Sequence, residues 1–156
     1  MKIRFFGEIS LGGGEYEKQI HLNDRDIDLE LYLEDVIGKK DWILKYDEYV
    51  SQIPSLRVKI ENLLEKNFLN EGIVDEWIDF HINELNSNVL NIASENSSNS
   101  IKDNLFDILN LQRIALYPGN DEYAVWDFML DGNLSDEILV VITDSSGMVV
   151  DIAWEN

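Results

Sequence analysis

Histidine is the first side chain to consider for chemistry in this sequence, and it occurs twice, as His21 and His81. The run from His81 to Glu84 places a histidine and a carboxylate about one helical turn apart, a spacing that suits two metal ligands or an acid–base pair. One histidine and one carboxylate are too few for a zinc site without ligands from elsewhere in the chain. We therefore interpret His81 as a hydrogen-bonded, partly buried histidine and keep a catalytic role as the alternative.

Three further motifs resemble ligand-binding sequences but lack an essential part. Alternating aspartates at 24–28 have the spacing that opens a calcium loop, yet Leu29 takes the position where that loop needs glycine. The glycine run at 12–14 has neither the lysine nor the helix of a phosphate-binding loop. Serines at 94–100 and 145–146 have no neighbouring histidine in the sequence. We therefore expect neither a metal nor another cofactor.

The chain is strongly acidic, because 31 Asp and Glu against 12 Lys and Arg give its 156 residues a formal net charge of -19. Affinity for nucleic acid and for anionic membranes depends on Lys and Arg, so we expect neither as a partner. The absence of cysteine excludes disulfides and thiolate chemistry. The acidity is densest after residue 100, where 11 acidic residues accompany 2 basic ones. Such a field favours a basic protein partner.

The elements that position these residues can be read from hydrophobic periodicity. Strict alternation of apolar and polar residues predicts an N-terminal meander of three strands, over 2–11, 15–22 and 27–33. The period then changes to that of amphipathic helices. These helices are expected over about 42–53, 55–68, 73–85 and 101–109. The stretch at 86–100, rich in Asn and Ser, is expected to be a polar surface loop.

The last third of the chain returns to strand patterns. The strands are expected at 112–117, 123–130, 138–142 and 148–154. The third of these is apolar on both faces, which is typical of a central strand. The whole pattern predicts a single α+β domain over 1–156. In it, an antiparallel sheet built from the N-terminal and C-terminal meanders has three to four helices packed on one face.

Trp126 is the aromatic residue that we expect to serve as an exposed anchor. We expect Trp126 and Phe128 to lie on opposite faces of their strand, which would expose the indole beside Asp127 and Glu122. An exposed tryptophan among charged residues is typical of a binding hot spot. The alternative is that the helices cover this face of the sheet and bury Trp126.

The most distinctive segments are Arg-Ile-Ala-Leu-Tyr-Pro at 113–118, Ala-Val-Trp-Asp-Phe at 124–128 and the helix expected at 74–85. They resemble a bacterial family named domain of unknown function 2004, and the similarity extends over nearly the whole chain. That family has no established enzymatic activity and is associated with immunity genes of polymorphic-toxin systems. The resemblance therefore implies a cytoplasmic immunity protein, not an enzyme, that neutralises a cognate toxin. It supplies no catalytic residues.

The acidic turns after residue 100 are the surface that we expect to bind a toxin, because a nuclease toxin has a basic cleft that an acidic inhibitor can occupy. The candidate contacts are Asp121, Glu122, Trp126, Asp127, Asp131, Asp136 and Glu137. Two alternatives stay open: a small enzyme that uses paired carboxylates or His81, and a non-catalytic acidic adaptor. We expect cytoplasmic localisation because no export signal or apolar span of ~20 residues is present.

Overall fold

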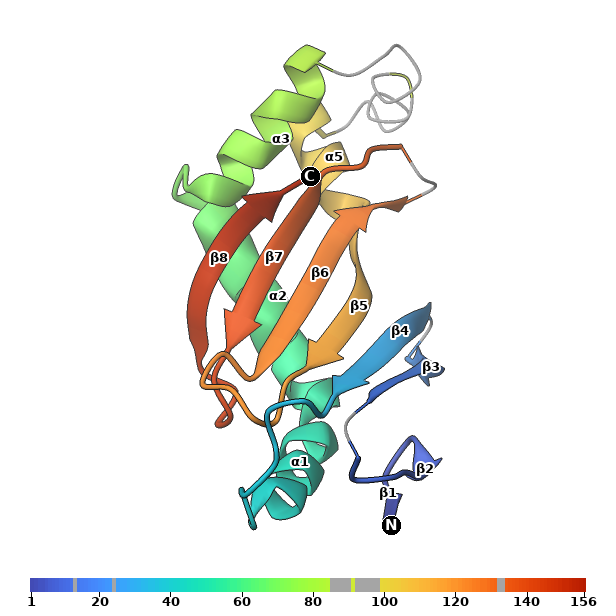
Figure 1. The fold of residues 1–156 in the computed structure, drawn as a ribbon. Helices are drawn as coiled ribbons and strands as arrows, with labels where there is room; N and C mark the ends of the chain where they lie inside the picture. Colours follow the sequence, from blue (N-terminus) through green and yellow to red (C-terminus); the bar gives the residue numbers. More distant parts are fainter. Residues whose placement is uncertain (13, 24, 85–90, 92–98, 132–133) are drawn as a thin grey trace.

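The computed structural model describes the chain except residues 13, 24, 85–90, 92–98 and 132–133. Within the described part, helices pack on a six-stranded sheet and a separate two-stranded hairpin lies near the N-terminus, which confirms the α+β class (Figure 1). The strands are β1 (Lys2–Ile3), β2 (Gly7–Glu8), β3 (Glu15–Leu22), β4 (Arg25–Tyr32), β5 (Leu109–Leu116), β6 (Ala124–Leu130), β7 (Ile138–Thr143) and β8 (Val149–Glu155). The helices are α1 (Trp42–Ser51), α2 (Ile53–Leu69), α3 (Ile73–Glu84) and α5 (Ile101–Asp107).

The segment expected as one strand over 2–11 is interrupted. β1 and β2 pair with each other and do not join the six-stranded sheet. Phe5 and Gly7 have positive φ angles of 72° and 69°, and this left-handed backbone turns the chain back instead of extending it. The first meander therefore contributes two strands to the main sheet, β3 and β4, and not three.

One strand pair of the main sheet is parallel. The order is β3-β4-β5-β6-β7-β8, and every neighbouring pair is antiparallel except β4 with β5. The parallel register runs from Asp28 opposite Arg113 to Leu31 opposite Leu116. Parallel neighbours need a crossover connection, which the helices between β4 and β5 supply. The antiparallel sheet that the sequence predicted thus contains one parallel pair, because the helical layer returns the chain to the end where β4 begins.

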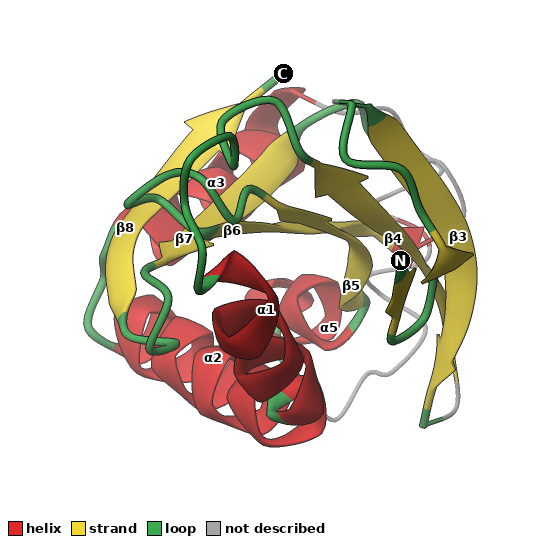
Figure 2. Cartoon of the chain, turned by 60° about the horizontal axis from the view of Figure 1, so that its bottom comes forward, coloured by secondary structure: helices red, strands yellow, loops and turns green. Residues whose placement is uncertain are grey.

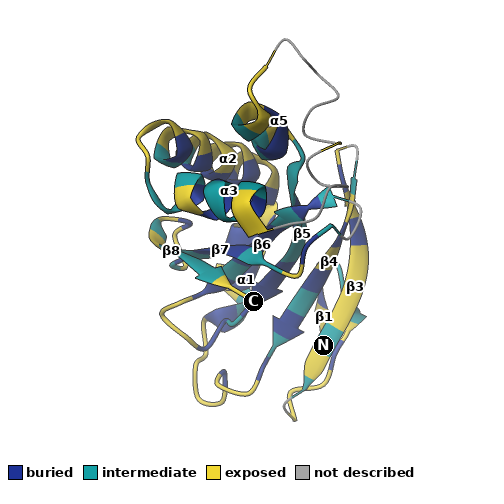
Figure 3. Ribbon diagram, turned by 90° about the horizontal axis from the view of Figure 1, so that it is seen from above, coloured by how far each residue is buried: buried dark blue, intermediate teal, exposed yellow. Residues whose placement is uncertain are grey.

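The helices cover one face of the sheet and leave the other face open (Figure 2). Buried residues make up much of the central strands, whereas buried and exposed positions alternate along the helices (Figure 3). Among the largest fully buried side chains are Leu29, Tyr49, Ile60, Trp77, Trp126 and Phe128. No helix in the described residues is both long and apolar enough to cross a bilayer.

Two arginines connect the strands on either side of the parallel junction. Arg113 on β5 donates hydrogen bonds to Glu30 on β4 at 2.6 Å and to Asp127 on β6 at 2.8 Å. Arg25 on β4 donates two hydrogen bonds to Asp131, just after β6, at 2.8 and 3.1 Å. The hydrogen bond from Arg113 lowers the pKa of Glu30, whereas burial raises the pKa of Asp127 in spite of the same guanidinium. We call these two sets of ion pairs the arginine clamps.

Replacing Arg113 with methionine should destabilise the fold by about 2–3 kcal/mol, because Asp127 would lose its guanidinium partner in a nearly buried site and Glu30 would keep only the Tyr32 hydroxyl. The loss is smaller than for a fully buried pair because the Arg113 side chain is 29% exposed. Urea unfolding would measure the change. Lys18→Met is the matched control, since it removes an exposed cation that has no ion pair among the described residues.

The effect of Arg113→Met should depend on pH. Without the guanidinium, the pKa of Asp127 rises further above its unfolded value, so the folded variant binds a proton that the unfolded chain does not. A carboxyl with a raised folded-state pKa gains stability as pH falls. The destabilisation should therefore shrink between about pH 8 and about pH 5. A loss that stays constant over this range would contradict the assignment of the clamp.

Candidate functional site

The predicted contact residues are not brought together. Asp121 and Glu122 lie in the turn before β6, whereas Asp131, Asp136 and Glu137 lie in the connection after it. Because β6 has 7 residues and a strand rises about 3.3 Å per residue, the two groups are about 20 Å apart along the strand. The sequence predicted one acidic contact surface, but the structure separates it into two ends of the sheet.

Trp126 is not an exposed anchor, because its side chain is 0% exposed. Its indole Nε1 donates a hydrogen bond to Tyr49 Oη at 2.9 Å, and that hydroxyl also bonds to Thr143 Oγ1 at 2.6 Å. Residues two apart in a strand share a face, so Trp126 and Phe128 both point towards the helices, contrary to the expectation that they face opposite ways. The alternative, that helices cover this face, is the arrangement found.

Three of the predicted acidic contacts already have partners within the fold. Asp127 is 8% exposed and, like Asp131, is held by the arginine clamps. Glu137 accepts a hydrogen bond from the indole of Trp154. The predicted acids that are exposed and have no partner among the described residues are Asp121, Glu122 and Asp136.

His81 is fully buried, and both of its ring nitrogens are engaged. Its Nδ1 lies 2.7 Å from the Trp77 carbonyl oxygen, which can only accept, so Nδ1 carries the proton and Nε2 of the neutral ring accepts from Ser135 Oγ at 2.8 Å. Burial lowers the pKa of His81 and favours this neutral form. Ser135 also accepts a hydrogen bond from the Glu137 backbone N–H. The set joins α3 to the connection between β6 and β7.

The Ser135–His81 pair has the distances of a nucleophile and its base, and sequence reasoning missed it because 54 positions separate the two residues. The hollow beside it, lined by Phe80, Glu137 and Trp154, includes neither side chain. Both groups are buried, and their hydrogen bond holds α3 against the connection between β6 and β7.

The remaining motifs have local roles or lie outside the described residues. In the calcium-like run, Asp26 pairs with His21 at 2.7 Å, and residue 24 is not described. The same holds for residue 13 of the glycine run and for most of the polar loop expected at 86–100. The described residues contain no group of three or more His, Asp or Glu that could hold a metal ion.

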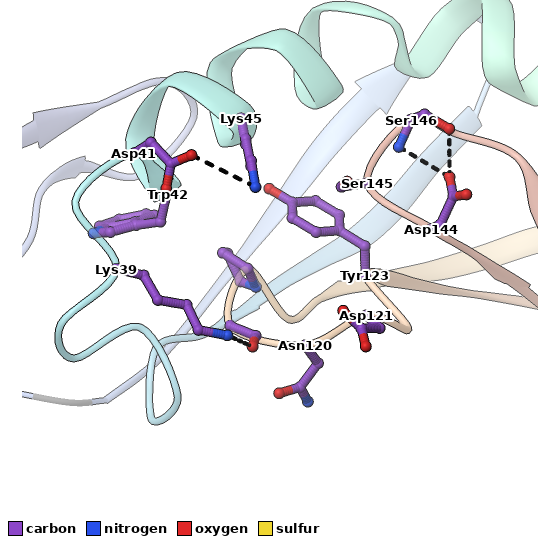
Figure 4. Close-up of a pocket in the computed structure, with 12 residues that line it drawn as sticks. Lys39, Asp41, Trp42, Lys45, Asn120, Asp121, Tyr123, Asp144, Ser145 and Ser146 are labelled. Carbon is purple, nitrogen blue, oxygen red and sulfur yellow. Dashed lines mark hydrogen bonds and ion pairs between the residues drawn. The ribbon is translucent and has the colours of Figure 1, made fainter.

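A cavity lies where three segments distant in sequence meet. We call this part of the molecule the loop end; it comprises residues 33–41, 117–123 and 144–148. The cavity, the loop-end pocket, has a volume of about 220 Å³ and is open to solvent on one side (Figure 4). Its walls are Lys39, Asp41, Trp42, Lys45, Pro118, Gly119, Asn120, Asp121, Tyr123, Asp144, Ser145 and Ser146.

Two walls of the pocket are held together at Gly119. A Cβ atom at this position would collide with the backbone carbonyl of Asp35, so only glycine allows the β5–β6 turn to approach the loop after β4 this closely. Lys39 Nζ donates a hydrogen bond to the Gly119 carbonyl across the same contact. Gly119, which has no side chain, and Lys39 thus fix the distance between the β5–β6 turn and the loop after β4.

The third wall, the β7–β8 turn, is fixed by its own hydrogen bonds. Asp144 Oδ1 accepts from Ser146 N at 2.9 Å, from Ser146 Oγ at 2.6 Å and from Met148 N at 3.0 Å. These donors, led by the Ser146 hydroxyl, lower the pKa of Asp144. Gly147 has a φ of 85°, and a Cβ there would collide with Leu56 of α2, so the turn is seated on the helix.

Tyr123 places an unpaired hydroxyl in the pocket wall. Its side chain is 1% exposed, its ring packs 4.9 Å from that of Tyr49, and its Oη has no hydrogen-bond partner among the described residues. Burial raises the pKa of Tyr123, so the hydroxyl keeps its proton. Figure 4 shows this hydroxyl and the ammonium of Lys45 directed towards each other. Lys45 itself lies 3.6 Å from Asp41.

A second hollow of about 140 Å³ adjoins this pocket and shares Gly119 and Asn120 with it. The rings of Tyr32 and Tyr117 stack in its wall, 4.8 Å apart and 8° from parallel. Glu34 and Asp35 also line it. We call it the tyrosine hollow; it combines aromatic faces with carboxylates, which is the chemistry that receives a cation.

Comparisons of this chain with protein-family models, curated proteins and solved structures return no match. The family resemblance seen in the sequence therefore stays a prediction, and the function has to be argued from geometry and charge.

The hydroxyl of Tyr49 should be a main stabilising contact between α1 and the sheet. Tyr49→Phe leaves Trp126 Nε1 and Thr143 Oγ1 without this partner in a buried site, which should cost about 1–3 kcal/mol of unfolding free energy. Urea unfolding would measure it. Tyr117→Phe is the control, because its hydroxyl has no hydrogen bond among the described residues; an equal loss in both variants would contradict the role of Tyr49.

Gly119→Ala should disrupt the loop end, because the added methyl group collides with the Asp35 backbone. We expect a lower Tm and amide chemical-shift changes concentrated at 33–41 and 117–123. Gly12→Ala provides the control, since a Cβ at Gly12 meets nothing within 4 Å. If the two variants melt at the same temperature and Gly119→Ala leaves those amides unmoved, the close approach is not a constraint.

Proposed function

We propose that this chain is an acidic immunity protein that acts in the cytoplasm by binding a basic toxin at its loop end. The observation that carries the proposal is the excess of uncompensated negative charge. The described residues form nine ion pairs, which engage nine of the 31 acidic side chains. The other carboxylates leave the surface with a field that attracts a basic protein and repels phosphate backbones.

The loop end is the part of this surface best suited to a protein contact. Asp121 and Glu122 are exposed there and unpaired among the described residues, whereas Asp136 lies at the other end of β6. The tyrosine hollow supplies aromatic contact area, which interfaces use as anchors. Its carboxylates, Glu34 and Asp35, favour a lysine or arginine of the partner. These tyrosines replace Trp126 as the proposed anchor.

The burial and hydrogen bonding of His81, the strongest catalytic candidate in the sequence, favour a binding role over a catalytic one. His81 is buried, neutral and bonded at both ring nitrogens, so it has no free atom to offer a substrate. The proposal therefore assigns this chain an inhibitory role that depends on contact alone, with no reaction of its own. A basic partner that is not a toxin would make the chain an acidic adaptor.

The experiment uses the gene directly upstream in the source genome, where an immunity gene would have its toxin. Co-expression of the two should restore growth to cells that the upstream product inhibits. The purified proteins should bind with an affinity that falls steeply with salt, since the Debye length shrinks from about 10 Å at 0.1 M to about 3 Å at 1 M. If the upstream product neither inhibits growth nor binds, the immunity role is wrong.

The contact surface is tested by charge reversal. Asp121→Lys/Glu122→Lys should weaken binding at least about tenfold at low salt, because it replaces attraction with repulsion at the loop end. Glu65→Lys/Glu71→Lys changes the net charge equally at exposed, unpaired positions on and just after α2. Equal losses for the two pairs would mean that net charge matters and the loop end does not.

A further inference from the structure

We infer that the loop-end pocket binds a small oxyanion of the phosphate or carboxylate type. This site lies within the loop end and shares Asp121 with the proposed contact surface, but the inference does not rest on the proposed function. An anion site is unexpected in a protein with a net charge of -19. Any affinity for an anion must therefore come from the groups that line the cavity. At physiological ionic strength, charges beyond the Debye length of about 8 Å are largely screened, which leaves those local groups in control.

The first observation is the unpaired hydroxyl of Tyr123. Among the described residues, two buried side-chain polar atoms lack a partner, Trp77 Nε1 and Tyr123 Oη. The Trp77 ring packs against His81 within the core, whereas Tyr123 lines the pocket. An unpaired donor at the wall of a cavity stays unsatisfied until a ligand or water accepts its proton. The donor of Tyr123 therefore points to a ligand with an accepting oxygen.

Two ammonium groups border the same cavity. Lys45 is 54% exposed and has only a 3.6 Å contact with Asp41, so its side chain can turn to a ligand while keeping that carboxylate within reach. Lys39 lies on the opposite wall, where it bonds to the Gly119 carbonyl and retains further donor hydrogens (Figure 4). Helix α1 also begins here without a side-chain cap, and free N–H groups at a helix start favour anions.

The pocket also holds three carboxylates, with which a ligand has to compete for the two lysines. Asp41 lies 3.6 Å from Lys45, and Asp144 already accepts bonds from Ser146 and Met148. Asp121 is exposed at the rim. Asp144 is thus engaged by donors of its own turn, whereas the Tyr123 hydroxyl has no partner among the described residues and each lysine has donor hydrogens beyond the contact that it already makes.

The size of the cavity sets the size of the ligand. A water molecule occupies about 30 Å³ in the liquid, so a pocket of about 220 Å³ holds a few waters or one small ion with part of its hydration shell. Phosphate and short carboxylates fit this space. The shared requirement is an anionic oxygen placed between Tyr123 and Lys45.

The test is a titration of the full chain with inorganic phosphate and, separately, with acetate, at matched ionic strength. Binding would be followed by the amide signals of Gly119, Asn120, Ser145 and Ser146 in ¹⁵N–¹H spectra. We expect saturable shifts. Binding of phosphate alone, of acetate alone or of both would identify the preferred oxyanion, and binding of neither would overturn the inference.

Two variants separate a built site from diffuse ion binding. Tyr123→Phe should keep the fold, since the lost hydroxyl has no partner among the described residues, and should weaken binding about tenfold, the loss expected for one hydrogen bond to a charged group. Lys45→Met should weaken it at least as much. Lys66→Met, an exposed cation near the end of α2, should have no effect. If all three variants bind alike, the pocket is not the site.

Discussion

The parallel pairing of β4 with β5 is the constraint on which the rest of the structure depends. It joins the two halves of the sheet across the whole helical layer, and it is the pair for which the chain must bring together the most distant residues. Parallel direction means that both strands end at the same edge, so the loop after β4 lies beside the β5–β6 turn. An antiparallel pair would have sent that loop to the opposite edge, and neither the loop-end pocket nor the tyrosine hollow would exist.

The arginine clamps show how an acidic chain holds such a junction. Parallel pairing is slightly less stable per residue than antiparallel pairing, and here Arg113 and Arg25 add charge-assisted bonds between β4, β5 and the strand that follows. The sequence has only 12 lysines and arginines, and two of these form ion pairs that connect β4 and β5 with β6 and the residue after it. Asp127 and Asp131 consequently belong to the architecture, while Asp121 and Glu122 are exposed and have no ion pair among the described residues.

Periodicity alone was enough to predict the local elements. Alternation located β3, β4, β6 and β8, and helical spacing located α1, α2, α3 and α5, each within a few residues. It did not predict the break at Phe5, since a positive φ at a bulky residue has no signature in hydrophobicity. Nor did it show strand direction, because alternation is the same in parallel and antiparallel strands.

The site was less predictable than the fold. A strand pattern shows that Trp126 alternates with its neighbours but not which face the helices cover, so its burial could not be decided from the sequence. The Ser135–His81 bond and the pocket walls join residues far apart in sequence, and only the assembled sheet brings them together. Gly119 carried the one usable signal, because a glycine after proline marks a turn, yet nothing in the sequence shows that Asp35 lies against it.

Within the described residues, the six-stranded sheet ends in β3 on one side and in β8 on the other, and an edge strand offers backbone groups to which a strand of another molecule can pair. β8 exposes Asp151 and Glu155, so two copies meeting at their β8 edges would bring like charges together, whereas β3 exposes Lys18 as well as Glu15 and Glu17. The same acidity that is proposed to recruit a basic partner therefore also opposes pairing between the β8 edges of two copies.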